Sequence, residues 1–137
     1  MTIQEWLVDY LRTAGAVAGT IHQREGDGLH LGAASNIPER VQAVVRWVPR
    51  GKGMAGLALE SGEPVQTCNL KDDSSGQVRP GAKAVNAGAA IALPVRDNQG
   101  AIAAVVGVAF AEEREMLQAE VSRLSNEAAT LIPLLLS

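Results

Sequence analysis

The residue type best suited to chemistry in this chain occurs once, as Cys68. A thiol at the end of a strand, beside Thr67 and Asn69, could contact a ligand or undergo oxidation. Free cysteine is also a common small buried residue, which is the alternative interpretation. A single cysteine cannot form an internal disulfide, so the sequence fits a reducing compartment and a cytoplasmic location.

Charged residues of both signs gather in residues 69–88, directly after this cysteine. Asp72 and Asp73 could bind a cation or the amine of a ligand, and Arg79 and Lys83 could bind an anion. The same residues also fit a solvated turn with local ion pairs. The aspartates lack the glycine and the final glutamate of a calcium-binding loop. We treat Cys68, Asp72, Asp73, Arg79 and Lys83 as candidate ligand-binding residues.

Two further patterns suggest sites less strongly. The turn Gly51-Lys52-Gly53 precedes a short helix, where free N–H groups can hold an anion, but the second half of a nucleotide phosphate loop is missing. His22 and His30 are expected to point to opposite faces of a hairpin. We therefore expect no metal site, no cofactor and no catalytic residue.

Length and composition exclude several classes of protein. The 137 residues form one domain, with 47% apolar and 3% aromatic residues and a net charge of −3. No basic stripe alternates with aromatic residues, so we expect no nucleic-acid partner. We expect neither a signal peptide nor a membrane span, since no apolar run approaches the roughly 20 residues that a span needs.

Helices are expected at both ends. In residues 2–14, Thr2 and Glu5 form a capping-box pattern and Gly15 is placed to end the helix. From Glu112 onward a second long helix is expected, with Pro133 disturbing its last turns.

Strands and short helices should fill the middle of the chain. Residues 16–23 and 29–35 are predicted to pair across a Gly26-Asp27 turn. A short helix to about Val45, an extended Trp47-Val48-Pro49, a helix within residues 51–61 and a strand over 64–68 follow. After the long loop of residues 69–88, the small apolar runs 89–95 and 101–110 are typical of central strands.

Both terminal helices carry apolar residues at alternating spacings of three and four. Such a seam either packs on the chain's own sheet or pairs two chains in a helical bundle, and we expect a homodimer. The candidate interface residues are Leu7, Tyr10, Leu117, Val121, Leu124, Leu131 and Leu135.

The chain resembles the GAF domain family. The resemblance is carried by residues 50–59, by Ser61-Gly62-Glu63-Pro64-Val65, by residues 90–95, by Gly100 and by residues 105–108. It implies a single α+β domain over residues 1–137, built on an antiparallel sheet of five or six strands. The terminal helices would cover one face, and short helices and the long loop would roof a pocket on the other.

Signatures of the better-known activities of the family do not match this chain. Cyclic-nucleotide binders have an Asn-Lys pair, followed later by a Phe and an Asp-Glu pair. Here Leu70 follows Asn69, and the positions after Phe110 that would hold the acidic pair are Arg114-Glu115. Bilin-binding members attach the chromophore through a cysteine, commonly next to a histidine, and Cys68 has no such neighbour. Free methionine sulfoxide reductases need several cysteines, whereas this chain has one.

The resemblance therefore implies a stand-alone sensor or regulatory domain that binds a small molecule and signals through its terminal helices to an effector protein. A ligand-free dimerisation or protein-interaction module is the alternative. A redox enzyme that uses Cys68 is a third hypothesis.

Overall fold

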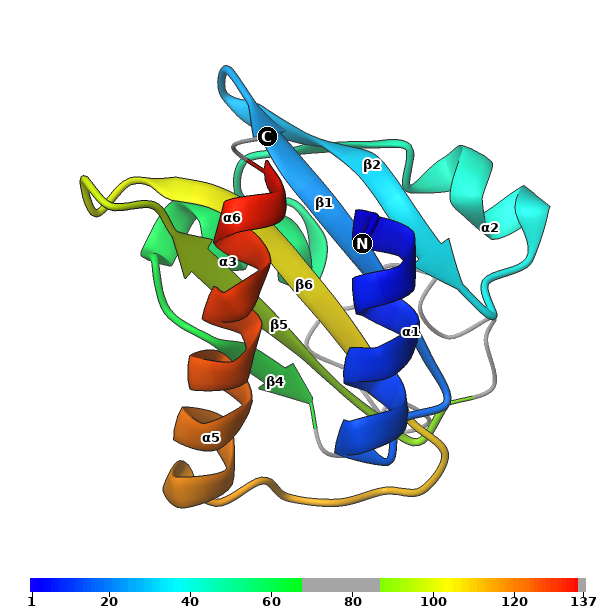
Figure 1. Cartoon of the computed structure of the whole chain (residues 1–137). Coiled ribbons are helices and arrows are strands. Elements are labelled where there is room, and N and C mark those ends of the chain that lie inside the picture. The colour runs from blue at the N-terminus through cyan, green and yellow to red at the C-terminus, as the bar shows by residue number, and fades with distance from the viewer. Residues whose placement is uncertain (68–86, 136–137) are drawn as a thin grey trace.

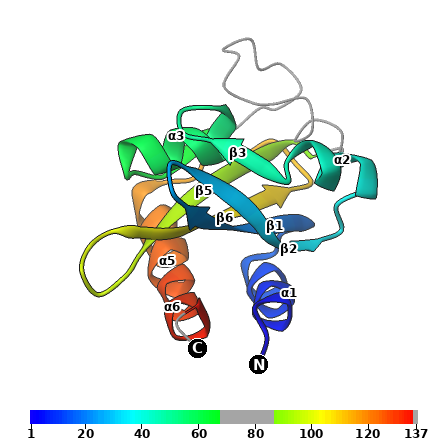
Figure 2. The ribbon, with the colours of Figure 1, turned by 90° about the horizontal axis from the view of Figure 1, so that it is seen from above.

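One antiparallel sheet of six strands, in the order β3-β2-β1-β6-β5-β4, carries helices on both faces (Figures 1 and 2). The computed structural model describes residues 1–67 and 87–135. Helices α1 and α5 lie on one face, and α2 and α3 lie on the other (Figure 2). The predicted α+β architecture is confirmed. No helix in the described ranges is long and apolar enough to cross a membrane.

Helix α1 (Ile3–Ala14) begins and ends as predicted. The Thr2 side chain accepts a hydrogen bond from the Glu5 N–H, and the Glu5 carboxylate accepts one from the Thr2 N–H. Hydrogen bonding of the Glu5 carboxylate by the Thr2 backbone N–H, and next by the Thr2 side chain, holds the pKa of Glu5 below its ordinary value. Gly15 ends the helix with a φ of 74°, a left-handed conformation that glycine adopts without strain.

The first hairpin, β1 (Ala18–Glu25) and β2 (Gly28–Ser35), has the predicted register. His22 lies opposite Leu31 and Gln23 lies opposite His30. Neighbouring residues of a strand face opposite ways, so the two histidines lie on different faces of the sheet. His30 pairs with Glu25 at 2.9 Å.

Short elements follow the hairpin in the predicted order. They are α2 (Glu39–Val44), β3 (Trp47–Pro49), α3 (Gly53–Ser61) and β4 (Val65–Thr67). Strands β3 and β4 form the two edges of the sheet.

The second long hairpin provides the middle of the sheet. Strand β5 (Ala89–Arg96) pairs with β6 (Ile102–Phe110), and β6 also pairs with β1. In the turn between them, the Asp97 carboxylate accepts hydrogen bonds from the N–H groups of Gln99 and Ala101. This side chain therefore takes the place of backbone acceptors in the turn.

The C-terminal helix starts later than expected. Helix α5 spans Gln118–Ala128, and the residues after Phe110 are irregular up to Leu117. Two contacts hold this connection away from a helix: Arg114 lies over the Phe110 ring, and the Met116 backbone bonds the Gln66 side chain. Near Pro133 the helix tightens into a 3-10 turn (Ala129–Leu131) before α6 (Ile132–Leu135), as the proline predicts.

The seams of both terminal helices pack mainly on the chain's own sheet. Leu7, Leu124 and Leu131 are completely buried there, and Tyr10 and Val121 are nearly so. Only Leu117 is largely exposed, while Leu135 is half-buried. Burial in the core explains the apolar spacing without a second chain, and the predicted homodimer would need neighbouring, exposed residues.

Candidate functional site

The predicted ligand-binding residues lie outside the part of the chain that the structure describes. They are Cys68, Asp72, Asp73, Arg79 and Lys83, all within residues 68–86. Their role stays a prediction. A site can still be built from the described residues, on the face of the sheet opposite α1 and α5.

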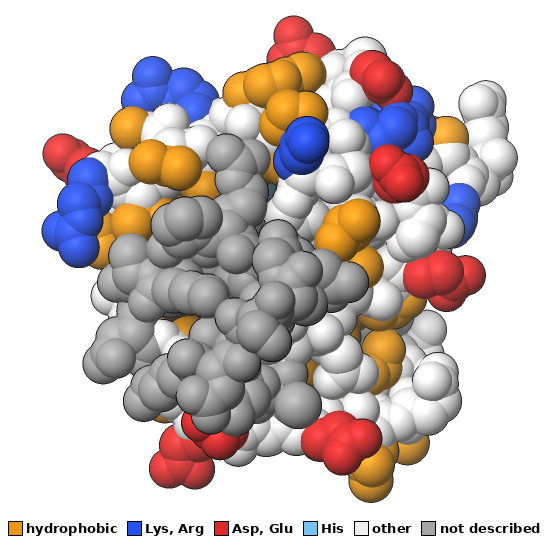
Figure 3. Space-filling view, turned by 180° about the vertical axis from the view of Figure 1, so that it is seen from behind, with side chains coloured by type: hydrophobic (Ala, Val, Ile, Leu, Met, Phe, Trp, Pro, Cys, Tyr) orange, Lys and Arg blue, Asp and Glu red, His pale blue; other side chains and the backbone are white. Residues whose placement is uncertain are grey.

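A cavity of about 130 Å³ lies on that face, between the sheet and the two short helices α2 and α3. Its walls are mainly aliphatic and include Ile37, Val41 and Val45 next to α2, Val48 of β3 and Met54 of α3. Figure 3 looks onto this side of the molecule, where apolar side chains appear among charged ones. Mainly aliphatic walls of this kind favour an apolar guest.

The floor of the cavity exists because small residues meet across three neighbouring strands. In the register of β1, β6 and β5, two successive rows hold no side chain larger than threonine. The rows are Ala18, Ala109 and Ala90, followed by Thr20, Gly107 and Ala92. The next row, His22, Val105 and Pro94, is bulkier and bounds the floor.

Gly107 leaves room for the Thr20 side chain on the neighbouring strand. A Cβ atom built on it would stand 2.7 Å from the Thr20 hydroxyl oxygen, closer than real contacts allow. The threonine hydroxyl thus occupies the space next to this glycine, and the pair sets the depth of the cavity at its centre.

His22 places a polar ring in the apolar wall. The residue is only 3% exposed, and its Nε2 lies 2.8 Å from the carbonyl oxygen of Val45. Because a carbonyl only accepts hydrogen bonds, Nε2 carries the hydrogen. In the neutral ring, Nδ1 is then the acceptor. The bond ties strand β1 to the end of α2 across the cavity.

Lys52 brings the charge. It precedes α3 in a tight turn, in which Gly51 and Gly53 have φ angles of 82° and 64°. The Gly51 N–H donates to the Gly56 carbonyl at 2.8 Å. A Cβ atom on Gly56 would lie 2.4 Å from the Pro49 oxygen, so α3 packs directly on β3. These glycines therefore serve the turn and the packing.

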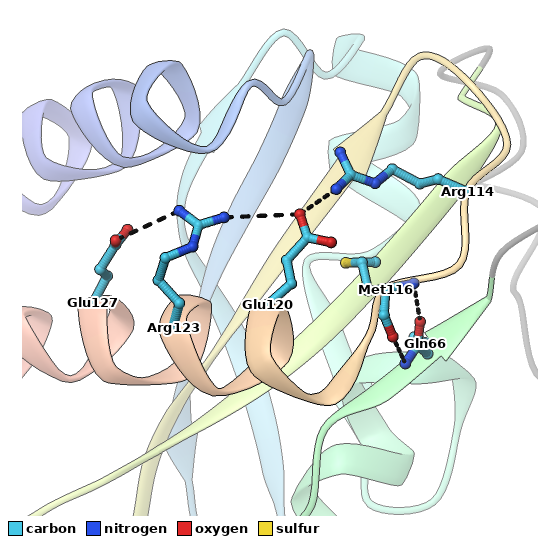
Figure 4. Close-up of polar contacts among 6 residues, drawn as sticks. All are labelled: Gln66, Arg114, Met116, Glu120, Arg123 and Glu127. Atoms are coloured by element: carbon cyan, nitrogen blue, oxygen red, sulfur yellow. Dashed lines mark hydrogen bonds and ion pairs between the residues drawn. The ribbon is translucent and has the colours of Figure 1, made fainter.

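Strand β4, at the sheet edge next to β5, contacts the segment that leads into the C-terminal helix (Figure 4). The Gln66 side-chain amide donates to the Met116 carbonyl at 3.4 Å, and its oxygen accepts from the Met116 N–H at 3.3 Å. The side chain thus pairs with the backbone as a neighbouring strand would.

An ion-pair chain continues from this point along α5. Glu120 pairs with Arg114 and, at 3.7 Å, with Arg123, which in turn lies 3.7 Å from Glu127 (Figure 4). The Arg114 guanidinium stacks 4.6 Å from the centre of the Phe110 ring. Most of these groups are partly exposed, so the ion pairs orient the segment around the start of α5 more than they stabilise the fold.

Nothing in residues 1–67 and 87–135 suggests metal chemistry, because no three His, Cys, Asp or Glu side chains gather there in a way that could hold an ion. The described features are instead a mainly aliphatic cavity and, at one edge of the sheet, a contact between β4 and the segment before α5.

Comparison with known protein families agrees with this architecture. The family model described as "GAF domain" matches residues 2–132. The chain belongs to the GAF domain family. No curated protein matches it.

Solved structures with the same fold include a GAF domain of a larger protein and a reductase. The GAF domain of a phosphoenolpyruvate-protein phosphotransferase from Acinetobacter has a TM-score of 0.76 at 14% identity, covering 99% of this chain and 83% of that one. A type II free methionine-R-sulfoxide reductase from Thermoplasma acidophilum has a TM-score of 0.74 at 17% identity, with 97% and 89% covered. At these identities the likeness shows the fold alone.

Reasoning from the sequence missed the residues that form the cavity of this GAF domain. Thr20 and His22 were not proposed as ligand contacts, and Lys52 was considered only as part of a turn that could hold an anion. The available signal was the coincidence of small residues on three strands. It becomes visible only when the register of β1, β6 and β5 is known.

Proposed function

We propose that this GAF domain is a sensor or regulatory domain that binds a small, mainly apolar molecule between the sheet and the helices α2 and α3. The observation that carries the proposal is the cavity of about 130 Å³. Its size is close to that of an engineered cavity of about 150 Å³ that stays dry and binds benzene.

Energetics favour a guest in this space. The lining atoms of an empty apolar cavity lack contacts on one side, which costs dispersion energy. A molecule that fits the small-residue floor restores those contacts. Binding would therefore stabilise the folded domain.

The route of the signal is part of the proposal. Strand β4 borders β5, whose Ala90 and Ala92 lie on the floor, and the Gln66 amide joins β4 to Met116 before α5. We propose that ligand occupancy changes the position of the terminal helices, which then act on an effector protein or on a second copy in a homodimer. A cytoplasmic location is part of this proposal.

A thermal-shift screen of small metabolites tests ligand binding. A ligand at a hundred times its dissociation constant should stabilise the domain by about 2.7 kcal/mol and raise its Tm by several degrees. The variant Ala109→Leu, which fills the floor, should fold and lose at least tenfold in affinity for any compound found. Ala101→Leu makes the same change at an exposed position outside the cavity and should bind normally.

Two results would contradict ligand sensing: no compound stabilises the protein, or Ala109→Leu binds each compound as well as the unchanged chain. Either result would favour the ligand-free interaction module.

We further propose that the domain is not an enzyme, although free methionine-R-sulfoxide reductases share its fold. The chain has one cysteine, and a disulfide-forming reductase cycle needs a second thiol. We expect no reduction of free methionine-R-sulfoxide by the protein, even with a small thiol that could take the place of the second cysteine. Turnover that disappears in Cys68→Ser would instead establish a thiol enzyme.

A further inference from the structure

We infer that the guest of the cavity is a short-chain aliphatic acid, with its hydrocarbon part on the small-residue floor and its carboxylate at Lys52. This inference rests on the proposed function and names the chemical class of the ligand. It follows from three properties of the described wall: the sign of its charge, the place of that charge, and the size and shape of the apolar space.

The charge of the wall is positive. Lys52 is the one charged side chain among the described lining residues, and no aspartate or glutamate is among them. None of the ion pairs within residues 1–67 and 87–135 involves Lys52. Its ammonium group can therefore pair with an anionic ligand without breaking an ion pair of the described structure.

The charge lies where an anion can remain partly hydrated. Lys52 is exposed, and the three residues after it, Gly53, Met54 and Ala55, also line the cavity. A carboxylate at this end keeps contact with water, whereas one at the floor would lose its hydration at high cost. The cavity defines the site, and the lysine sets the orientation of the guest within it.

Size and shape limit the apolar part. A space of about 130 Å³ is slightly smaller than one that holds benzene, which corresponds to roughly four to six carbon atoms. The wall side chains Ile37, Val41, Val45, Val48 and Met54 are all aliphatic. A compact branched chain makes more contacts with such a surface than a long thin one.

The same wall disfavours other ligand classes. A ligand with an ammonium group would lose hydrating water and would find no carboxylate among the described lining residues to pair with. A nucleotide base with its sugar would extend well beyond the aliphatic part of the space and would find few polar partners there. An amide of the same carbon skeleton should enter but would lack the charge interaction with Lys52.

Three compounds with one carbon skeleton test the inference: 3-methylbutanoate, 3-methylbutanamide and 3-methylbutylamine. Ligands this small bind weakly, so affinities should be measured by amide NMR titration at millimolar concentrations and low ionic strength. We expect the carboxylate to bind at least fivefold more tightly than the amide, and the amine to bind most weakly. Adding salt should reduce the difference between carboxylate and amide.

The variant Lys52→Met keeps an unbranched apolar stem and removes the charge. It should lower carboxylate affinity to that of the amide and leave amide affinity unchanged. Arg24→Gln changes the net charge equally at an exposed residue outside the cavity, and should alter neither affinity. Ala109→Leu should weaken all three compounds by blocking the floor.

Amine binding equal to carboxylate binding would overturn the preference for acids, as would a Lys52→Met variant that keeps full carboxylate affinity. In both cases the proposed function would still stand if the amide binds and if Ala109→Leu weakens that binding. If none of the three compounds binds, the inference fails, while the wider metabolite screen still decides the proposed function.

Discussion

At the scale of single residues, Tyr10 shows how the core uses a polar group. Its ring stacks on Trp6 with centroids 4.7 Å apart, and its hydroxyl donates to the Leu124 carbonyl at 2.8 Å. Burial raises the pKa of the Tyr10 hydroxyl well above its ordinary value, and the nearby Glu127 carboxylate raises it further. One side chain thus joins α1 to α5 through a bond that requires the protonated phenol.

This environment predicts alkaline sensitivity. A phenol whose pKa is raised by folding stabilises the native state below its unfolded pKa of about 10, and this contribution is lost as pH rises further. We expect unfolding stability to fall above about pH 10. Tyr10 is the only tyrosine, so absorbance of the phenolate reports it without interference.

Tyr10→Phe provides the control. It should cost about 1 kcal/mol at neutral pH through the lost hydrogen bond. It should also remove the phenolate signal and weaken the fall in stability above pH 10. Titration of Tyr10 near pH 10 in the folded protein would contradict its buried, bonded state.

The sequence predicted the roles of turn and cap residues better than those of site residues. The Thr2–Glu5 cap, the Gly26-Asp27 turn and the two glycines around Lys52 act locally, and local rules identify them. Thr20 and His22 belong to the candidate site because of residues on other strands, which sequence spacing does not show.

At the scale of elements, the contact between β4 and the segment before α5 is the clearest coupling. Gln66→Leu would remove both bonds to the Met116 backbone and leave a partly buried N–H and carbonyl without this partner. We expect a loss of about 1 to 2 kcal/mol in stability and faster hydrogen exchange at the start of α5. Hydrogen-exchange mass spectrometry would measure the exchange rate in α5, with β1 as the internal reference.

Gln99→Leu is a matched control, since Gln99 is exposed in the turn between β5 and β6. It should leave exchange in α5 unchanged. If Gln66→Leu behaves like this control, β4 does not act on the C-terminal helix, and the proposed route of the signal is wrong.

The elements themselves were predictable except where tertiary contacts compete with helix formation. The residues Glu112 to Glu115 are compatible with a helix, which led to the expected early start. The stack of Arg114 on Phe110 and the Gln66 contacts keep this segment irregular. Both competing contacts involve partners that a helical spacing pattern does not include.

At the scale of the whole molecule, the two terminal helices cover the same face of the sheet (Figure 1). Their inner sides are committed to the core, but Val8 is 46% exposed and Leu117 is 71% exposed. The proposed homodimer would therefore use the outer sides of these helices.

A change of charge on the outer side of α1 tests this dimer. Val8→Glu should raise the dissociation constant of the dimer at least tenfold, because a carboxylate would lose its hydration in an apolar interface. Analytical ultracentrifugation would measure this as a shift toward the monomer. Val44→Glu, on helix α2 of the other face, should leave the association unchanged. Monomeric unchanged protein at all concentrations would contradict the dimer.

The pairing of β1 with β6 has a consequence for how the protein is made. These neighbours in the middle of the sheet come from opposite ends of the chain, since Ala18 pairs with Ala109. Contacts of such high sequence separation slow folding, because a long loop must close before they form. Before β6 leaves the ribosome, a nascent chain lacks the strand that joins β1 to the β4–β5 pair, so β1 is an unprotected edge. We therefore expect the sheet to be completed only late in synthesis, after an interval in which this edge is exposed to aggregation.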